Sequence, residues 1–126
     1  MKHLVDASFM LALILGERVA PGTEALLDGS AISAVNLSEI FRKLIDNGMP
    51  LEEAISTTDG LQLEVIPFDQ AMAAHAARLR PLTKHLGLSF ADRACLAVAQ
   101  QRELVVYTAD RDWAELDIGL DIRMIR

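Results

Sequence analysis

Four carboxylates lie near points where an apolar run gives way to a helical pattern. These residues are Asp6, Glu39, Asp92 and Asp110. Asp6 directly follows Leu4-Val5, and Asp110 comes soon after the apolar run 104–107. A parallel sheet would bring such points to one edge, where open α/β proteins bind their ligands. Four acids there would form an oxygen-rich pocket, which suits hard cations such as Mg²⁺ or Mn²⁺.

Helix capping is the competing explanation for each acid taken singly. Asn36-Leu37-Ser38-Glu39 and Ser89-Phe90-Ala91-Asp92 both place an acid three residues after a residue that can cap a helix. Such an acid bonds the backbone of the cap residue and complements the helix dipole. Asp6 and Asp110 are also suitable N-cap residues. Four acids at related junctions favour a metal site, but spacing alone leaves the two interpretations about equally supported.

Two hydrophobic periodicities alternate along the chain. Strands are predicted at 3–5, 31–35, 63–66, 104–107 and 122–125, and helices at 7–15, 37–46, from Pro50 onward, at 70–80 and at 90–101. Asp92 is expected to follow an extended stretch at 86–88, and Pro81 to break or kink the chain. Alternating strands and helices predict an α/β fold with a mostly parallel central sheet flanked by helices. The length of 126 residues predicts one domain spanning 1–126.

Composition limits the possible functions. The net charge of −6 argues against indiscriminate nucleic-acid binding, although carboxylate-bound cations would reverse the local charge. The longest apolar run, 9–15, is too short to span a bilayer, and we expect a cytoplasmic protein without membrane contact. Cys95 is the only cysteine and is expected to be a buried small side chain. With scattered histidines, a zinc site is disfavoured.

Basic residues surround the predicted approach to Asp92. Arg93 and Lys84 are the candidates for binding RNA phosphates. The alternative interpretation is that they are ordinary charged residues on a solvent-exposed helix face and loop. Arg42 and Lys43 allow the same two interpretations, because they lie one turn after Glu39. Glu39 and Lys43 are also spaced for an i,i+4 ion pair.

Four segments together resemble the motifs of PIN-domain ribonucleases, in particular the VapC toxins of type II toxin–antitoxin modules. These segments are Leu4-Val5-Asp6-Ala7-Ser8, Ser33-Ala34-Val35-Asn36-Leu37-Ser38-Glu39, Leu88-Ser89-Phe90-Ala91-Asp92-Arg93 and Thr108-Ala109-Asp110-Arg111-Asp112-Trp113. Their order and separation agree from residue 3 to the end of the chain. The resemblance implies a PIN-like fold with an acidic pocket at the C-terminal ends of the strands.

The resemblance also assigns roles to the residues of these segments. Asp6, Glu39, Asp92 and Asp110 match the metal-binding catalytic acids of the family, and Ser8 matches its supporting hydroxyl. Asp112 either assists Asp110 or caps a helix. Asp6 and Asp92 are the first-choice ligands for Mg²⁺, for which Mn²⁺ would substitute.

The resulting hypothesis is a metal-dependent endoribonuclease, the toxin of a toxin–antitoxin pair. Carboxylate-held Mg²⁺ orients the scissile phosphate, activates water and stabilises the leaving oxygen. The family resemblance further implies a cognate antitoxin and a homodimer, alone or within a toxin–antitoxin hetero-oligomer. The alternative is a catalytically inactive PIN-like module that binds a partner through the apolar first helix and residues 51–60. A receiver domain and a dehalogenase-type phosphatase fit poorly, since the latter needs an aspartate where Ser8 stands.

Overall fold

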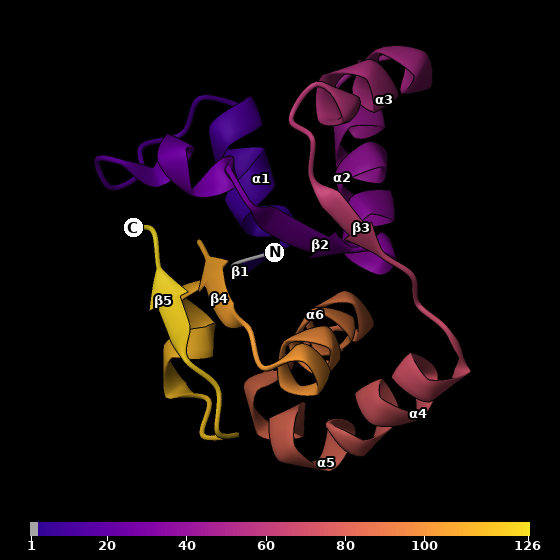
Figure 1. The fold of residues 1–126 in the computed structure, drawn as a ribbon, viewed down its shortest axis with the longest axis vertical. Coiled ribbons are helices and arrows are strands. Elements are labelled where there is room, and N and C mark those ends of the chain that lie inside the picture. Colours follow the sequence, from indigo (N-terminus) through magenta and orange to yellow (C-terminus); the bar gives the residue numbers. More distant parts are fainter. Residues whose placement is uncertain (1–2) are drawn as a thin grey trace.

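A computed structural model describes residues 3–126, and its centre is a five-stranded sheet. The strands are β1 (His3–Val5), β2 (Ser30–Ser33), β3 (Glu64–Ile66), β4 (Val105–Thr108) and β5 (Ile122–Met124). Their order in the sheet is β3-β2-β1-β4-β5, and every neighbouring pair is parallel (Figure 1). Chain order therefore reverses at β1, which makes the crevice beyond its carboxyl end the expected ligand site of such a sheet.

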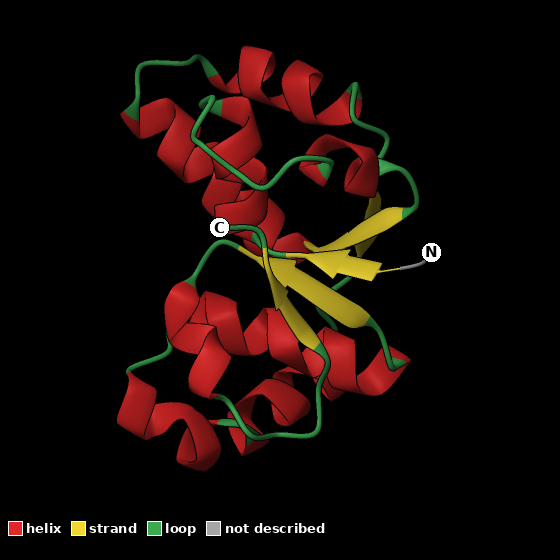
Figure 2. Ribbon diagram, turned by 90° about the vertical axis from the view of Figure 1, so that its left-hand side faces the viewer, coloured by secondary structure: helices red, strands yellow, loops and turns green. Residues whose placement is uncertain are grey.

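Helices cover both faces of this sheet, as Figure 2 shows. The α-helices are α1 (Ala7–Ile14), α2 (Ala34–Asp46), α3 (Leu51–Asp59), α4 (Gln70–Arg78), α5 (Arg80–Thr83) and α6 (Phe90–Arg102). Residues 3–126 also form three 3₁₀ turns: η1 (Thr23–Leu27), η2 (Lys84–Leu86) and η3 (Arg111–Glu115). Helices α1 to α3 lie on one side of the sheet and α4 to α6 on the other (Figure 1). The predicted α/β fold with a parallel sheet between helices is confirmed.

Alternating strand residues divide the core into two clusters. Leu4 packs with α4 and α6, whereas its neighbour Val5 packs with α1, α2 and α3. Ala31 and Ile32 alternate in the same way, because successive side chains of a strand point to opposite faces. Cys95 is fully buried in the first cluster, as predicted. Within residues 3–126 we find no helix of the length and apolarity needed to cross a membrane.

The junction between β2 and α2 differs from the sequence prediction. The strand ends at Ser33, and Val35, predicted to be extended, lies in the first turn of the helix. Ser33 is the N-cap, since its hydroxyl accepts a hydrogen bond from the Val35 amide at 3.2 Å. Asn36 is therefore not a cap, and Glu39 lies in the second helical turn, too far along to serve as a capping acid. The cap interpretation of Glu39 was wrong.

The approach to Asp92 also differs from the prediction. No strand forms at 86–88; instead the turn η2 ends at Gly87, whose φ of 66° is left-handed. The fourth predicted helix divides into α4 and α5, with Pro81 in the first turn of α5, a position that proline tolerates. Asp92 consequently reaches the sheet edge from the start of α6, and only Asp6 and Asp110 follow strands closely.

Candidate functional site

Asp6 lies at the carboxyl end of the central strand β1 and is 3% exposed. Its Oδ1 caps α1 by accepting from the Phe9 amide at 2.9 Å. The Ser8 hydroxyl donates to both carboxylate oxygens, at 2.8 and 2.9 Å, and the Thr108 hydroxyl donates to Oδ2 at 2.6 Å. A plain cap uses one acceptor oxygen. Here both oxygens are held, so the carboxylate has a fixed orientation.

The two hydroxyls also connect Asp6 to the loop after β4. Ser8 Oγ accepts from the Ala109 amide at 3.0 Å, and Thr108 Oγ1 accepts from the Asp110 amide at 3.0 Å. Because β4 pairs directly with β1, Thr108 ends beside Asp6. Ser8 lies beside Asp6 and bonds its carboxylate, and its supporting role in catalysis stays a prediction. Thr108 was not predicted to be a site residue, since only the pairing of distant strands brings it there.

Burial raises the pKa of Asp6 to about 6. The hydrogen bonds from Thr108, Phe9 and Ser8 counteract the loss of solvation, and the nearby charge of Asp92 raises the pKa further. Burial likewise raises the pKa of Asp92, with the charge of Asp110 acting in the same direction. A nearby cation would stabilise the ionised form of these carboxyl groups and lower their pKa.

Glu39 and Asp92 reach the site from two helices that pack against each other, α2 and α6. Asn36, 1% exposed, connects these helices because its Nδ2 donates to the Ala91 carbonyl at 3.1 Å. Asp92 also closes a capping box with Ser89: its Oδ2 accepts from the Ser89 amide at 3.0 Å, and the Ser89 hydroxyl accepts in return at 3.1 Å. Asp92 is thus a helix-capping residue and lines the site as well.

Asp110 precedes the 3₁₀ turn η3 and caps it, accepting from the Asp112 amide at 3.0 Å. Asp112 itself is exposed, and its side chain does not line the pocket that holds Asp110. The contact between Asp112 and Asp110 is therefore made by the backbone amide of Asp112 and not by its carboxylate. Whether its carboxylate assists Asp110 stays a prediction.

All four predicted acids line one pocket of about 240 Å³ at the C-terminal ends of the strands. The pocket is lined by Asp6, Ala7, Ser8, Asn36, Glu39, Arg42, Lys43, Ser89, Asp92 and Asp110. Across residues 3–126, however, no three acidic, histidine or cysteine side chains stand close enough to form a ready-made metal centre. The acids share the pocket without converging on a point, an arrangement that mutual repulsion of like charges favours.

The donors in this pocket fit an oxygen-preferring divalent cation. Carboxylates, hydroxyls and one amide supply its oxygens, and no histidine or cysteine of residues 3–126 belongs to it. The buried Oδ1 of Asn36 accepts no hydrogen bond within the same part of the chain. Buried polar atoms are normally satisfied, so an unpaired oxygen in the pocket wall suits a bound group that brings donors, such as the water shell of a cation.

The basic residues of the pocket are Arg42 and Lys43 on α2. Lys43 lies 4.0 Å from the half-buried Glu39, and Arg42 forms an exposed pair with Asp46 at 3.1 Å; both pairs have i,i+4 spacing. Arg93 follows Asp92 but lines a neighbouring pocket, because successive helical residues are rotated by about 100°. Lys84 is exposed in η2 and lines neither pocket. The phosphate-binding roles of Arg93 and Lys84 stay predictions.

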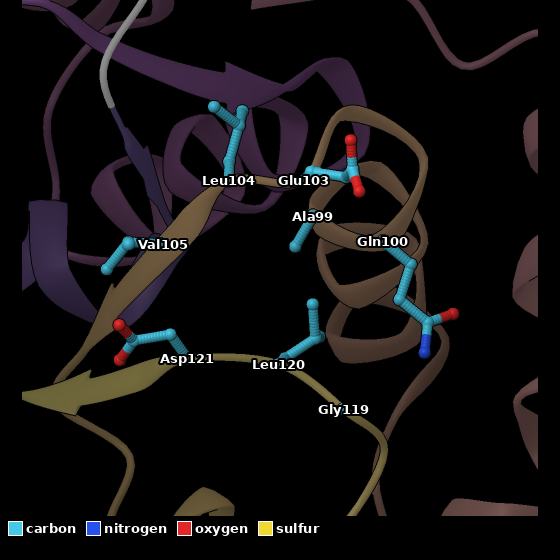
Figure 3. Close-up of a pocket in the computed structure, with 8 residues that line it drawn as sticks. All are labelled: Ala99, Gln100, Glu103, Leu104, Val105, Gly119, Leu120 and Asp121. Carbon is cyan, nitrogen blue, oxygen red and sulfur yellow. The ribbon is translucent and has the colours of Figure 1, made fainter.

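A larger pocket, of about 330 Å³, lies at the opposite end of β4 (Figure 3). Its side chains come from the end of α6, the start of β4 and the segment before β5. Gln100 bonds His75 and the Ile118 carbonyl, and Asp121 pairs with Arg123 at 2.9 Å. Two acids, Glu103 and Asp121, line this pocket, whereas Asp6, Glu39, Asp92 and Asp110 share the pocket at the other edge of the sheet.

Residues 3–119 match the family described as the PIN domain. The chain belongs to the PIN domain family. This match covers all four acids of the pocket, so the PIN domain of this chain carries them at the sheet edge where chain order reverses. A comparison with proteins of curated function finds no match.

Solved structures of VapBC and VapC proteins resemble this PIN domain over nearly its whole length. DNA-bound VapBC from Salmonella typhimurium is 20% identical, with 98% of each chain covered and a TM-score of 0.78. VapC20 from Mycobacterium tuberculosis, a Sarcin-Ricin loop cleaving toxin, is 18% identical, with 97% of this chain and 99% of that chain covered and a TM-score of 0.74. VapBC-5 of the same organism is 26% identical, with 99% and 98% covered and a TM-score of 0.67.

Proposed function

We propose that this PIN domain is a metal-dependent endoribonuclease and the toxin of a toxin–antitoxin pair. The observation that carries the proposal is the shared pocket of Asp6, Glu39, Asp92 and Asp110, in which hydroxyls hold a buried Asp6 whose pKa is raised to about 6. Burial and the neighbouring acidic charge disfavour the ionised forms of Asp6 and Asp92. A bound cation favours these ionised forms, and phosphodiester hydrolysis is chemistry that cations in such pockets support.

Asp6 and Asp92 are the proposed principal ligands, with Glu39 and Asp110 completing the set. A bound Mg²⁺ or Mn²⁺ would supply the positive charge that orients a phosphate, lowers the pKa of water and offsets charge on the leaving oxygen. Ser8 and Thr108 keep Asp6 oriented. Lys43 and Arg42 lie at the rim, where their charges attract the RNA backbone.

The products distinguish this mechanism from that of a histidine-dependent ribonuclease. No histidine of residues 3–126 lines the pocket, so water is the expected nucleophile and the products are a 5′-phosphate and a 3′-hydroxyl. The experiment incubates single-stranded or looped RNA with the protein and Mg²⁺ or Mn²⁺, then analyses the end groups.

Asp6→Asn and Asp92→Asn should each lose most of the cleavage activity while remaining folded, and Asp117→Asn, outside the pocket, is the control. Activity that survives EDTA, or a 2′,3′-cyclic product, would exclude the mechanism.

The partner we propose is a cognate antitoxin, because several similar structures are toxin–antitoxin complexes, including one from Klebsiella pneumoniae. The first helix and residues 51–60 meet around one largely apolar groove of about 370 Å³, which suits a helical partner. We expect the antitoxin to inhibit by covering the acidic pocket with a cationic side chain. A tight inhibitory partner whose contacts avoid the pocket would refute the proposal that the antitoxin covers it.

A homodimer is also expected, and light scattering would measure the oligomeric state.

A further inference from the structure

A second pocket adjoins the acidic one at the start of α6. It has a volume of about 350 Å³ and is lined by Ala73, Ala76 and Ala77 of α4 together with Arg80, Phe90 and Arg93. Phe90 and Arg93 are three residues apart and share one face of the helix, whereas Ser89 and Asp92 share the next face and line the acidic pocket. The first turn of α6 therefore separates the two pockets.

The charge of this second pocket is opposite to that of its neighbour. Its lining holds two arginines and no acidic residue, in a chain whose net charge is −6. Neither arginine joins an ion pair within residues 3–126, whereas Arg42 and Lys43 in the acidic pocket each pair with a carboxylate of α2. Two guanidinium groups without an ion-pair partner give this pocket a positive charge that suits an anionic ligand.

Arg93 has a donor with no acceptor. Its Nε is buried and makes no hydrogen bond within the described part of the chain. Buried donors are nearly always paired, because leaving one unpaired carries the full cost of removing it from water. A phosphate oxygen is the kind of acceptor that a guanidinium binds best, often through two parallel hydrogen bonds.

Phe90 adds an aromatic surface beside these arginines. Its side chain is 51% exposed, so one face of the ring is open to a ligand. Phe68 orients the ring through an edge contact, with centroids 5.4 Å apart and an interplanar angle of 89°. An oriented, exposed aromatic ring beside arginines is the combination that binds single-stranded nucleic acids, since unpaired bases stack on the ring and phosphates pair with the cations.

We propose that Arg80, Phe90 and Arg93 form a subsite for the RNA strand next to the scissile phosphate. Phe90 stacks an unpaired base, and the arginines bind the phosphates that flank it. The inference deepens the proposed ribonuclease function and rests on it for the identity of the polymer. It explains how an acidic protein holds RNA: the strand crosses the first turn of α6 from the carboxylate pocket to a basic one. An acidic protein segment is the competing occupant.

The test measures binding without cleavage. Fluorescence anisotropy in EDTA follows labelled single-stranded oligo(A) and oligo(U) binding to the wild type, Phe90→Leu, Arg80→Gln and the control Arg102→Gln, an exposed arginine at the far end of α6. Phe90→Leu keeps the apolar contact with Phe68 but removes stacking, and should weaken binding about tenfold. Arg80→Gln should lower the slope of log Kd against log salt concentration by about 0.7, the share of one phosphate contact to a single strand.

The outcomes separate this proposal from the proposed function. If Phe90→Leu and Arg80→Gln bind RNA as the wild type does while metal-dependent cleavage persists, the subsite is wrong and the ribonuclease stands. If both variants lose RNA binding but the wild type never cleaves RNA, the subsite stands and the ribonuclease fails. An acidic peptide such as oligoglutamate that binds in an Arg80-dependent manner, with no RNA binding at all, would assign the pocket to a protein partner and overturn the proposal.

Discussion

Asp6 combines a structural role with the chemical role that we propose for it. It begins α1 as an N-cap, yet Ser8 and Thr108 also hold its oxygens, and burial raises its pKa to about 6. Asp92 combines roles in the same way, as a member of a capping box that also lines the pocket. Capping and metal binding are therefore compatible for these residues, because a carboxylate has two oxygens and several acceptor positions.

Replacing Thr108 by valine should raise the pKa of Asp6. The Thr108 hydroxyl donates to the ionised carboxylate at 2.6 Å and lowers its pKa, so the nearly isosteric valine removes a bond that favours the charged form. Carboxyl carbon NMR during a pH titration measures the shift. Thr57→Val, on α3 with its hydroxyl bonded to the Glu53 carbonyl, is the control. An unchanged Asp6 pKa in Thr108→Val would contradict the assigned hydrogen bond.

Replacing Asp92 by asparagine should stabilise the cation-free protein. Burial raises the pKa of Asp92 above its ordinary value, so at pH 7.5 its ionised form costs folding free energy. Asparagine keeps an acceptor for the Ser89 amide and removes the charge, and Tm in EDTA should rise by a few degrees. Asp69→Asn, an exposed cap bonded to the Met72 amide, is the matched control and should change Tm little. A lower Tm for Asp92→Asn would show that the negative charge of Asp92 stabilises the start of α6 by more than its burial costs.

Sequence reasoning located the four acids but not what surrounds them. Their residue types and their order within the four motifs carry the signal, because carboxylates are the side chains that the proposed Mg²⁺ or Mn²⁺ prefers. Thr108 and Asn36 gave no such signal, since threonine and asparagine occur widely for local reasons. Their roles depend on the pairing of β4 with β1 and on the contact of α2 with α6, which join residues far apart in the chain.

The first turn of α6 positions both pockets, so its cap has consequences beyond one helix. Ser89 accepts from the Asp92 amide and completes the capping box. Ser89→Ala should lower the free energy of unfolding by about 1 kcal/mol, as measured by urea denaturation. Ser56→Ala, at an exposed position within α3, is the control and should not lower the free energy of unfolding, because alanine is the better helix former. Equal stabilities for the two variants would show that the box contributes nothing measurable.

The helices and strands were predictable because their hydrophobic periodicity is clear. The residues at which they begin and end were harder to predict. The strand before α2 was extended two residues too far, since Ala34 and Val35 continue an apolar run and only the Ser33 cap marks the helix start. The extended stretch predicted at 86–88 is instead a 3₁₀ turn closed by Gly87. In both places a local hydrogen bond or a left-handed glycine decides the structure, and neither alters the hydrophobic pattern.

At the scale of the whole molecule, the free energy of unfolding of the metal-free protein should increase as the pH falls through the pKa of Asp6. The folded-state pKa of Asp6, about 6, exceeds its unfolded value of 3.8, so the folded protein binds the extra proton between these values. Unfolding free energy should therefore fall as pH rises from about 4 to 6, by roughly 3 kcal/mol through this group alone. Urea denaturation in EDTA at several pH values measures it. An identical pH slope in Asp6→Asn would contradict the assignment.

Divalent-cation binding is the central claim, and calorimetric titration of Mn²⁺ into the metal-free protein tests it most directly. We expect the wild type and Asp117→Asn to bind Mn²⁺ equally, because Asp117 lies outside the pocket. Asp6→Asn and Asp92→Asn should each bind at least tenfold more weakly, and Mg²⁺ should compete with Mn²⁺ in the wild type. Absence of binding by the wild type, or binding that both variants retain at full strength, would contradict the metal site and with it the proposed ribonuclease.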